Sequence, residues 1–205
     1  MTRLKDPGQP GSSSAPALAT RPRLPRAFYD RPALTVAREA LGMVLVRREP
    51  AGLQAGRIVE VEAYDGPGDA ASHARSGVTG RARIMFGPPG YAYVYLIYGM
   101  HHCLNFVTGP VGYPAAILLR GLEPLARITE RTNGPGLICR ALAIDRCLNG
   151  ADLTGDELWL EDWGRPVTDA DLVARPRVGI KFAGEPSVSR LWRLYERNNR
   201  WVSKR

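Results

Sequence analysis

The alternation of apolar and polar residues predicts a group of β-strands in the middle of the chain. The clearest is GRIVEVEAY at 56–64. A strict period of two places Val59, Val61 and Ala63 on one face of this strand. It places Ile58 on the other face, together with two glutamates and a tyrosine. Further strands are predicted at 43–46, 91–98, 103–107, 115–120, 157–161, 177–183 and near the C-terminus.

Short helices are predicted at 30–42, 122–131 and 136–146. In the first of them, Asp30 can cap the helix, Pro32 lies in its first turn and Gly42 ends it. The helices fall irregularly among the strands, without the regular strand–helix alternation of a parallel sheet. The pattern therefore favours an α+β fold.

The length of 205 residues predicts one domain with a substantial core. Residues 1–23 are rich in Pro, Gly, Ser and Ala, which predicts a disordered, mildly basic leader ahead of a folded domain at 24–205. No run of ~18 apolar residues is present, which excludes a transmembrane helix. The first residues also lack the apolar core of a secretory signal. Three cysteines without CxxC spacing argue against a disulfide scaffold, and we expect a cytoplasmic location.

The formal net charge of +8 is unevenly distributed. Among the 28 basic residues only Lys5, Lys181 and Lys204 are lysines, and the segment 175–205 contains nine basic residues but two acidic ones. A basic end on a nearly neutral body predicts a polyanionic partner, most simply nucleic acid whose phosphates this segment would meet. The alternative is a solvated, arginine-rich surface, and the charge alone does not decide between them.

Two glutamates on the 56–64 strand form a candidate acid–base pair. Glu60 and Glu62 are two residues apart, so their side chains point the same way and lie ~6–7 Å apart. That spacing would suit an inverting glycosidase. A polar face turned to solvent is the alternative interpretation. In the segment AAILLR, Leu118 and Arg120 likewise share one face.

The segment YAYVYLIYGM at 91–100 is unusually rich in tyrosine. Tyr91, Tyr93 and Tyr95 fall on one face at period two, which is compatible with ordinary core packing. The same rings would also form a stacking platform for flat ligands such as nucleobases. Tyr98 stands at the strand-to-turn corner, where a side chain can protrude as a wedge between base pairs.

Metal and hydrolase motifs are missing from the sequence. The neighbouring His101, His102 and Cys103 diverge on a strand, and neither paired CxxC motifs nor a deaminase pattern occurs, so we expect no metal site. No G-x-S-x-G elbow is present. The glycine turn at 134–136 precedes a predicted helix, whose N-terminus could hold one backbone phosphate.

Seven separated motifs, in order across residues 27–203, resemble the alkyladenine (3-methyladenine, methylpurine) DNA glycosylase family. They are GRIVEVEAY, ASHARSG, MFGPPGYAYVYLIYGMHHCLN, LLRGLEPL, NGPG, RALAID and RVGI. The resemblance implies a single mixed domain around a curved antiparallel sheet, with no metal or organic cofactor. It implies hydrolysis of the N-glycosidic bond of a damaged purine that is flipped out of double-stranded DNA.

The resemblance also implies roles for individual residues. Glu62 would be the base that activates water, which Arg120 and the backbone carbonyl of Val178 would help to hold. The walls of the base pocket would be Tyr64, His73, Tyr95, Asn105 and Leu118, with Asn105 as the steric filter against the amine of normal guanine. The DNA wedge would be Tyr98 with Met100 nearby, and the phosphate contacts would be Gly134 and Gly136.

Physical chemistry agrees with these roles and adds two expectations. A neighbouring Arg120 should lower the pKa of the Glu62 carboxyl and keep it charged at neutral pH. A lyase needs an amine for a Schiff base, and only Lys181 lies away from the chain ends, so we expect a monofunctional enzyme. We also expect a monomer.

The sequence departs from the family pattern at two places. Leu137 stands where the family usually has a lysine, which removes one expected phosphate contact and should weaken the salt dependence of DNA binding. The segment 123–133 is shorter than usual. Two other functions remain open at this point: a catalytically idle module that binds damaged nucleic acid, and a glycoside hydrolase that uses Glu60 and Glu62.

Overall fold

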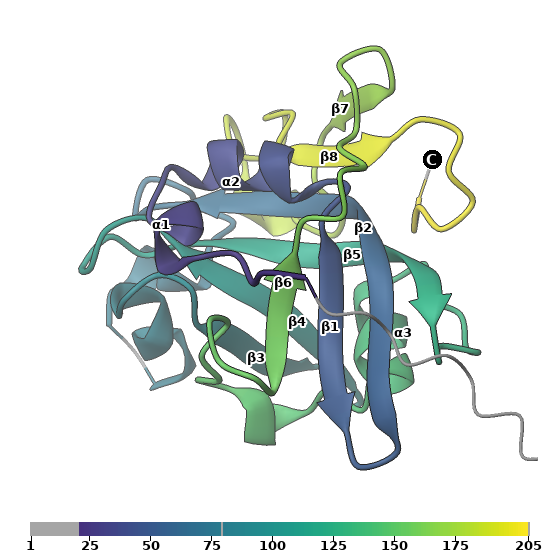
Figure 1. The fold of residues 1–205 in the computed structure, drawn as a ribbon. Coiled ribbons are helices and arrows are strands. Elements are labelled where there is room, and N and C mark those ends of the chain that lie inside the picture. The colour runs from purple at the N-terminus through teal and green to yellow at the C-terminus, as the bar shows by residue number, and fades with distance from the viewer. Residues whose placement is uncertain (1–20, 79, 205) are drawn as a thin grey trace, which may run out of the picture.

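A curled antiparallel sheet forms the body of the protein, as seen in the computed structural model (Figure 1). The structure describes residues 21–78 and 80–204. The strands are β1 (Val44–Glu49), β2 (Gly52–Asp65), β3 (Ala92–Ile97), β4 (His101–Thr108), β5 (Ala115–Ala126), β6 (Leu158–Glu161), β7 (Leu172–Arg175) and β8 (Arg193–Glu196). Their order is β3-β4-β5-β2-β1-β6, and β8 joins β2 to β7. The sheet curls into a half-barrel, which confirms the expected single mixed α+β domain.

The 14-residue strand β2 organises this sheet. One of its edges pairs with β5 over most of its length. The other edge pairs first with β1, at residues 52–57, and then with β8, at residues 60–62. The half of β2 that carries the two glutamates therefore lies between β5 and the C-terminal strand β8.

A β-bulge on β2 corrects the predicted faces of this strand. The pairing with β5 shifts between Ile58 and Glu60, which leaves Val59 as the extra residue. Ile58 therefore joins Val61 in the main hydrophobic core and does not share a face with Glu60. Both glutamates are fully buried, so the alternative interpretation, a polar face turned to solvent, was wrong.

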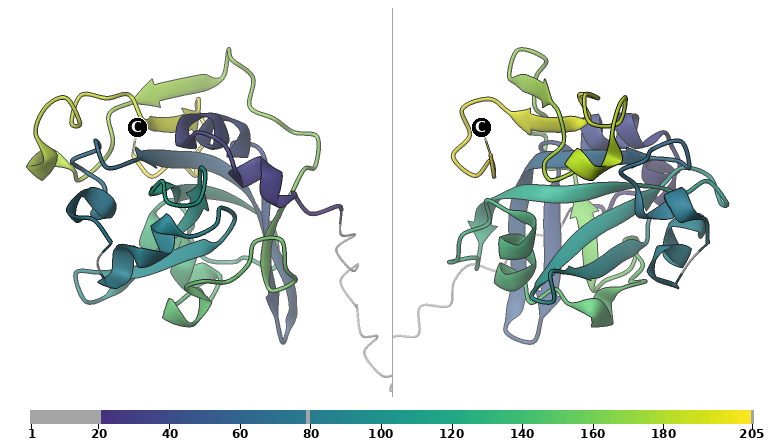
Figure 2. Two further views of the ribbon diagram at one scale, coloured as in Figure 1. Left: turned by 90° about the vertical axis from the view of Figure 1, so that its left-hand side faces the viewer. Right: turned by 180° about the vertical axis from the view of Figure 1, so that it is seen from behind.

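Alternating residues of β4 and β5 supply two separate hydrophobic layers. Phe106 and Ile117 face the main core, where α1 (Arg26–Tyr29), α2 (Ala33–Ala40) and α3 (Pro135–Ala141) pack. Val107 and Ala116 face the opposite layer, beneath the 3₁₀ helices η1 (His73–Ser76) and η2 (Gly80–Phe86). The reverse view in Figure 2 shows β3, β4 and β5 crossing the molecule, with α3 at one side and η1 and η2 at the other.

The predicted helix at 30–42 is confirmed in part. α2 covers its middle, and Gly42, whose φ is 92°, follows the end of the helix. A Cβ on Gly42 would lie 2.2 Å from the carbonyl oxygen of Arg165, so only glycine fits there. Asp30 does not cap α2: it ends α1, and Pro32 occupies the N-cap position.

Two other predicted elements were wrong. The segment 122–131 is not a helix, because residues 122–126 continue β5 and Glu123 pairs across the strands with Arg57 of β2. The segment 177–183 is not a strand: Pro176 follows the end of β7, and Gly179 turns the chain with a φ of 78°. The third predicted helix is shorter than expected, since α3 ends at Ala141 and Ala143 adopts a φ of 48°.

The predicted leader lies outside the described residues up to position 20. Of the remainder, Arg23 forms an antiparallel bridge with Glu161, and its guanidinium carbon lies 4.6 Å from the centroid of a Trp159 ring. Within the described part of the chain, no helix combines the length and the apolar character needed to cross a membrane.

A buried ion pair holds the 176–180 segment against β2. Arg177 donates to Asp69 through Nη1 at 2.5 Å and Nη2 at 2.7 Å, and both side chains are fully buried. The same guanidinium donates to the carbonyl oxygens of Ala63 and Ser187. Because a buried charge needs a close partner, this two-pronged contact fixes where the segment lies.

We expect Asp69→Ala to lower the free energy of unfolding by about 3–5 kcal/mol, because it leaves the Arg177 charge buried and unpaired. Equilibrium unfolding in urea, followed by tryptophan fluorescence, measures the change. Asp169→Ala is the matched control, because Asp169 also pairs with an arginine, Arg38, but has a 94 % exposed side chain. The control should unfold almost as the parent protein does. Equal losses in the two variants would contradict the assigned role of the buried pair.

Candidate functional site

A cavity of about 420 Å³ opens on the face of β3, β4 and β5 that lies away from the main core. It is lined by residues from β2 to β5, from η1 and η2, from the start of α3 at 134–137 and from the segment 178–182. Apart from Glu62 and Met100, every residue that the family resemblance singled out lines this cavity. The topology thus brings together positions more than a hundred residues apart in the sequence.

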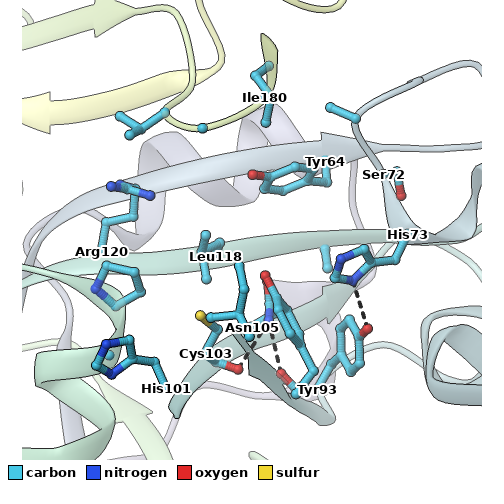
Figure 3. Close-up of a pocket in the computed structure, with 18 of the residues that line it drawn as sticks. Tyr64, Ser72, His73, Tyr93, His101, Cys103, Asn105, Leu118, Arg120 and Ile180 are labelled. Atoms are coloured by element: carbon cyan, nitrogen blue, oxygen red, sulfur yellow. Dashed lines mark hydrogen bonds between the residues drawn. The ribbon is translucent and has the colours of Figure 1, made fainter. Parts of the chain in front are cut away.

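Aromatic rings form one wall of the cavity. His73 Nδ1 lies 2.9 Å from the hydroxyl oxygen of Tyr93, and a dashed line marks this contact in Figure 3. The His73 ring packs edge-on against Tyr95 at a centroid distance of 4.6 Å. Burial is the main cause that raises the pKa of Tyr95, which keeps its phenol neutral. Tyr93 belongs to the stacking platform that the period-two spacing predicted, although the family resemblance did not include it among the pocket walls.

The floor of the cavity comes from neighbouring strands. Asn105 and Leu118 are cross-strand partners on β4 and β5, and both are nearly fully buried. Asn105 Nδ2 donates to the carbonyl oxygens of Tyr93, at 3.0 Å, and Cys103, at 3.4 Å. These contacts hold the amide in one orientation.

Glu62 lies directly behind the cavity wall and is fully buried. Its Oε1 accepts from the backbone N–H of Val178 at 2.7 Å and lies 3.4 Å from Nη1 of Arg120. Its Oε2 accepts from the hydroxyl of Tyr64 at 2.9 Å. All three partners line the cavity. Val178 touches the carboxylate through its N–H, whereas the resemblance assigned a role to its carbonyl oxygen.

The pKa of the Glu62 carboxyl is raised above its ordinary value, which corrects the expected direction. Burial is the largest cause and outweighs the lowering effects of Arg120, the Val178 N–H and the Tyr64 hydroxyl. Arg120 therefore acts in the predicted direction, but the desolvation of a fully buried carboxyl acts more strongly. A raised pKa makes the Glu62 carboxylate a stronger base than an ordinary glutamate.

Tyr64 links the cavity to the buried Asp69–Arg177 pair. The guanidinium carbon of Arg177 lies 4.6 Å from the centroid of the Tyr64 ring. Burial and the adjacent Glu62 carboxylate raise the pKa of the Tyr64 hydroxyl well above its ordinary value, so it remains a hydrogen-bond donor. Arg177 thus orients the ring from behind, and the neighbouring Val178 presents its N–H to Glu62.

Tyr98 occupies the tip of the β3–β4 hairpin at the mouth of the cavity. It has a φ of 53°, and Gly99 after it has a φ of 69°, so the chain reverses within the three residues between paired Ile97 and His101. The Tyr98 side chain is 83 % exposed and Met100 is 71 % exposed. Tyr98 is therefore not a core residue, and its side chain protrudes from the turn.

Two further segments line the cavity. Gly134, Gly136 and Leu137 come from the start of α3, and a Cβ on Gly136 would lie 3.1 Å from the His101 side chain. Phe182 also lines the mouth and is 66 % exposed, with the Arg75 guanidinium carbon 5.5 Å from its ring centroid. Sequence reasoning missed Phe182, because a lone aromatic residue in a predicted strand gives no signal.

The basic C-terminal segment does not form a uniform band. Arg177 and Arg193 are buried and paired with carboxylates, so they cannot meet an external polyanion. Among the described residues of the segment, the exposed basic side chains are those of Arg175, Lys181, Arg197, Arg200 and Lys204. Across the ranges that the structure describes, no group of three His, Cys, Asp or Glu residues is arranged to hold a metal ion.

Comparison with known proteins gives a consistent result. The model of the family described as Methylpurine-DNA glycosylase (MPG) matches residues 27–200. A relative from Anaeromyxobacter dehalogenans strain 2CP-C is 54 % identical over 89 % of this chain and 87 % of its own length. A relative from Methanocella arvoryzae is 52 % identical over 90 % of this chain and 97 % of its own length. A relative from Legionella pneumophila strain Corby is 46 % identical over 89 % of this chain and 98 % of its own length. All three are provisionally named 3-methyladenine DNA glycosylase.

The family match covers the whole of the curled sheet, the aromatic cavity and the buried glutamate behind it. The chain belongs to the methylpurine-DNA glycosylase family.

Proposed function

We propose that this protein is a monofunctional DNA glycosylase that starts base excision repair. It hydrolyses the N-glycosidic bond of an alkylated or deaminated purine flipped out of double-stranded DNA, using a water molecule activated by Glu62. One observation carries the proposal: Arg120, Tyr64 and the Val178 N–H converge on a fully buried carboxylate directly behind an aromatic cavity. Family membership supports the class of reaction.

The cavity suits a single flat base. Its volume of about 420 Å³ lies within the range of small-molecule sites. Tyr64, His73 and Tyr95 offer ring surfaces for stacking, and electron-rich rings favour bases that alkylation has made cationic. Asn105 is placed at the floor, where it can oppose the exocyclic amine of guanine.

A base in duplex DNA can reach this cavity only after it leaves the stack, which costs a few kcal/mol. The exposed Tyr98 at the tip of the β3–β4 turn would fill the vacated space, with Met100 beside it. Gly134 and Gly136, at the start of α3, would contact the backbone of the flipped nucleotide.

In the proposed reaction, the bond between the sugar C1′ and the purine nitrogen breaks and its electron pair leaves with the base. Positive charge develops on the sugar, and the Glu62 carboxylate stabilises it. Water, held between Arg120 and the Val178 carbonyl oxygen, attacks C1′ and gives a proton to Glu62. Each carboxylate oxygen of Glu62 retains acceptor capacity beyond its present contacts.

The alternatives differ in what they require of the two glutamates. A glycoside hydrolase needs both carboxylates at the cleaved bond. All three polar partners of Glu62 line the cavity, whereas Glu60 is enclosed by Arg120, Arg193 and Ser203, of which only Arg120 does. A lyase needs an amine, and no lysine of the described residues lines the cavity. A module that only binds damaged DNA would not need the buried Glu62 site. The base-release assay on Glu62→Gln and the parent protein tests this alternative.

We expect Glu62→Gln to lower the rate of base release by at least about 100-fold, because the amide cannot accept the proton of water. The measurement is a single-turnover assay on duplexes with one central ethenoadenine, hypoxanthine or 3-methyladenine. Glu39→Gln, on the exposed side of α2, is the control and should react as the parent protein does. Equal rates for Glu62→Gln and the parent protein would remove Glu62 from the mechanism, and no base release by the parent protein would favour the idle module.

The pH dependence should show the raised pKa of Glu62. Activity requires the carboxylate, so the rate falls as the pH drops through this pKa, and the fall begins at a higher pH than an ordinary glutamate would give. Tyr64→Phe removes a donor that stabilises the carboxylate, so the pKa should rise further and the acidic limb should move to higher pH. Single-turnover rates on one lesion across the pH range measure the acidic limb of the parent protein and that of Tyr64→Phe.

Tyr113→Phe is the control for this profile, because the Tyr113 hydroxyl also bonds a carboxylate, that of Asp65, but outside the cavity lining. Its acidic limb should coincide with that of the parent protein. A Tyr64→Phe limb that stays in place or moves to lower pH would contradict the assignment.

We expect Tyr98→Ala to weaken the capture of flipped lesions while leaving the free energy of unfolding within about 0.5 kcal/mol of the parent value, because the side chain is exposed. The fluorescence of ethenoadenine on unstacking reports flipping, and urea unfolding reports stability. Tyr98→Phe keeps the ring and should flip normally. A variant that unfolds would instead indicate a role in the core.

A further inference from the structure

Glu60 lies beside the proposed active site but not in its cavity. Its carboxylate is fully buried, and its Oε1 accepts from Arg193 Nη1 at 2.9 Å and from Arg120 Nε at 3.4 Å. Ser203 donates to both oxygens, through its backbone N–H to Oε2 at 2.5 Å and through Oγ to Oε1 at 3.0 Å. Glu60 therefore connects Arg120 to the C-terminal segment.

The Arg120 guanidinium is held on three sides. Nη1 faces Glu62 at 3.4 Å, Nε faces Glu60, and Nη2 donates to Ser203 Oγ at 3.1 Å. Ser203 thus contacts the guanidinium directly and also through Glu60. Only the Nη1 contact reaches the carboxylate that would activate water, and the other two determine the direction in which Nη1 points.

A bulge and a glycine on β5 allow the C-terminal segment 199–204 to approach Glu60 and Arg120. Arg120 is the extra residue in the β2–β5 pairing, since Glu60 pairs with Gly121 and Val61 pairs with Leu119. A Cβ on Gly121 would lie 2.7 Å from the carbonyl oxygen of Trp201 and 2.9 Å from the Glu60 Cβ. The carbonyl oxygen of Lys204 accepts from Arg193 Nη1 at 2.6 Å, which fixes the end of the segment.

We propose that Glu60 and Ser203 are positioning residues that aim Arg120 at Glu62, so that the rate of base release depends on the C-terminal segment. This inference rests on the function proposed above. A guanidinium presents several donors in a rigid fork, so its orientation is set by all of its partners together. A small misplacement of such a group can cost as much as about 100-fold in rate even when the substrate still binds.

The test compares Ser203→Ala with Ser203→Thr. Ser203→Ala removes the hydroxyl that contacts both Arg120 and Glu60, and the single-turnover rate should fall about tenfold while the dissociation constant for lesion-containing DNA stays unchanged. Ser203→Thr keeps an oxygen at the same position and should restore most of the rate. A role in folding alone would not produce this separation of rate from binding.

Ser189→Ala is the matched control. The Ser189 hydroxyl also bonds a glutamate, Glu185, but on an exposed loop of the same C-terminal region, so the rate should not change. Glu60→Gln keeps the shape of the side chain but removes its charge, and the rate should fall about 100-fold. Urea unfolding of each variant accompanies the rate measurements.

Three results would overturn the inference: a parent-like rate in Ser203→Ala, a loss of DNA affinity equal to the loss of rate, or a failure of Ser203→Thr to restore activity. Each of them requires an active parent protein. An inactive parent protein would instead contradict the proposed function itself, so the two failures are distinguishable.

Discussion

The structure depends on the burial of two carboxylates, Glu60 and Glu62, on one short stretch of β2. Neither side chain has any exposed surface, and removing a charge from water is costly unless close partners compensate. The compensation comes from distant parts of the chain: Arg120 from β5, Arg193 from β8, the Val178 N–H and the Ser203 segment. Each of these elements must therefore reach the same half of β2, which explains why β8 replaces β1 at this edge.

Two β-bulges, at Val59 of β2 and at Arg120 of β5, let these elements reach the two glutamates. In a regular β2–β5 ladder, alternate residues of β2 would lie on opposite faces of the sheet, and Arg120 would pair with a residue of β2. With the extra residue at Val59, the core keeps Ile58 and Val61 while both glutamates turn to the charged side. With the extra residue at Arg120, the following Gly121 lies under the C-terminal segment, where a larger residue would collide with Trp201. Irregular pairing thus creates the site.

The sequence predicted the parts of this arrangement that depend on local spacing. Period two was sufficient to place Leu118 and Arg120 on one face, and a tyrosine before Gly99 was sufficient to predict an exposed corner. The sequence alone could not predict the bulges, because the register of β2 depends on which strand pairs with it. The helix expected at 122–131 failed for the same reason, since pairing with β2 overrides local composition. The net direction of the Glu62 pKa also required the structure, because it depends on how far burial exceeds pairing.

The arginine excess is divided between two physical tasks. Arg177 and Arg193 use their rigid forks inside the protein, where a lysine could not make the same set of contacts at once. Arg175, Arg197 and Arg200 remain exposed and keep their charge available to phosphates. A buried pair such as Asp69–Arg177 adds almost no external field, so the formal charge of the segment overstates what a DNA backbone would meet. The surface potential therefore depends on which arginines the fold pairs with buried carboxylates, and composition alone does not determine it.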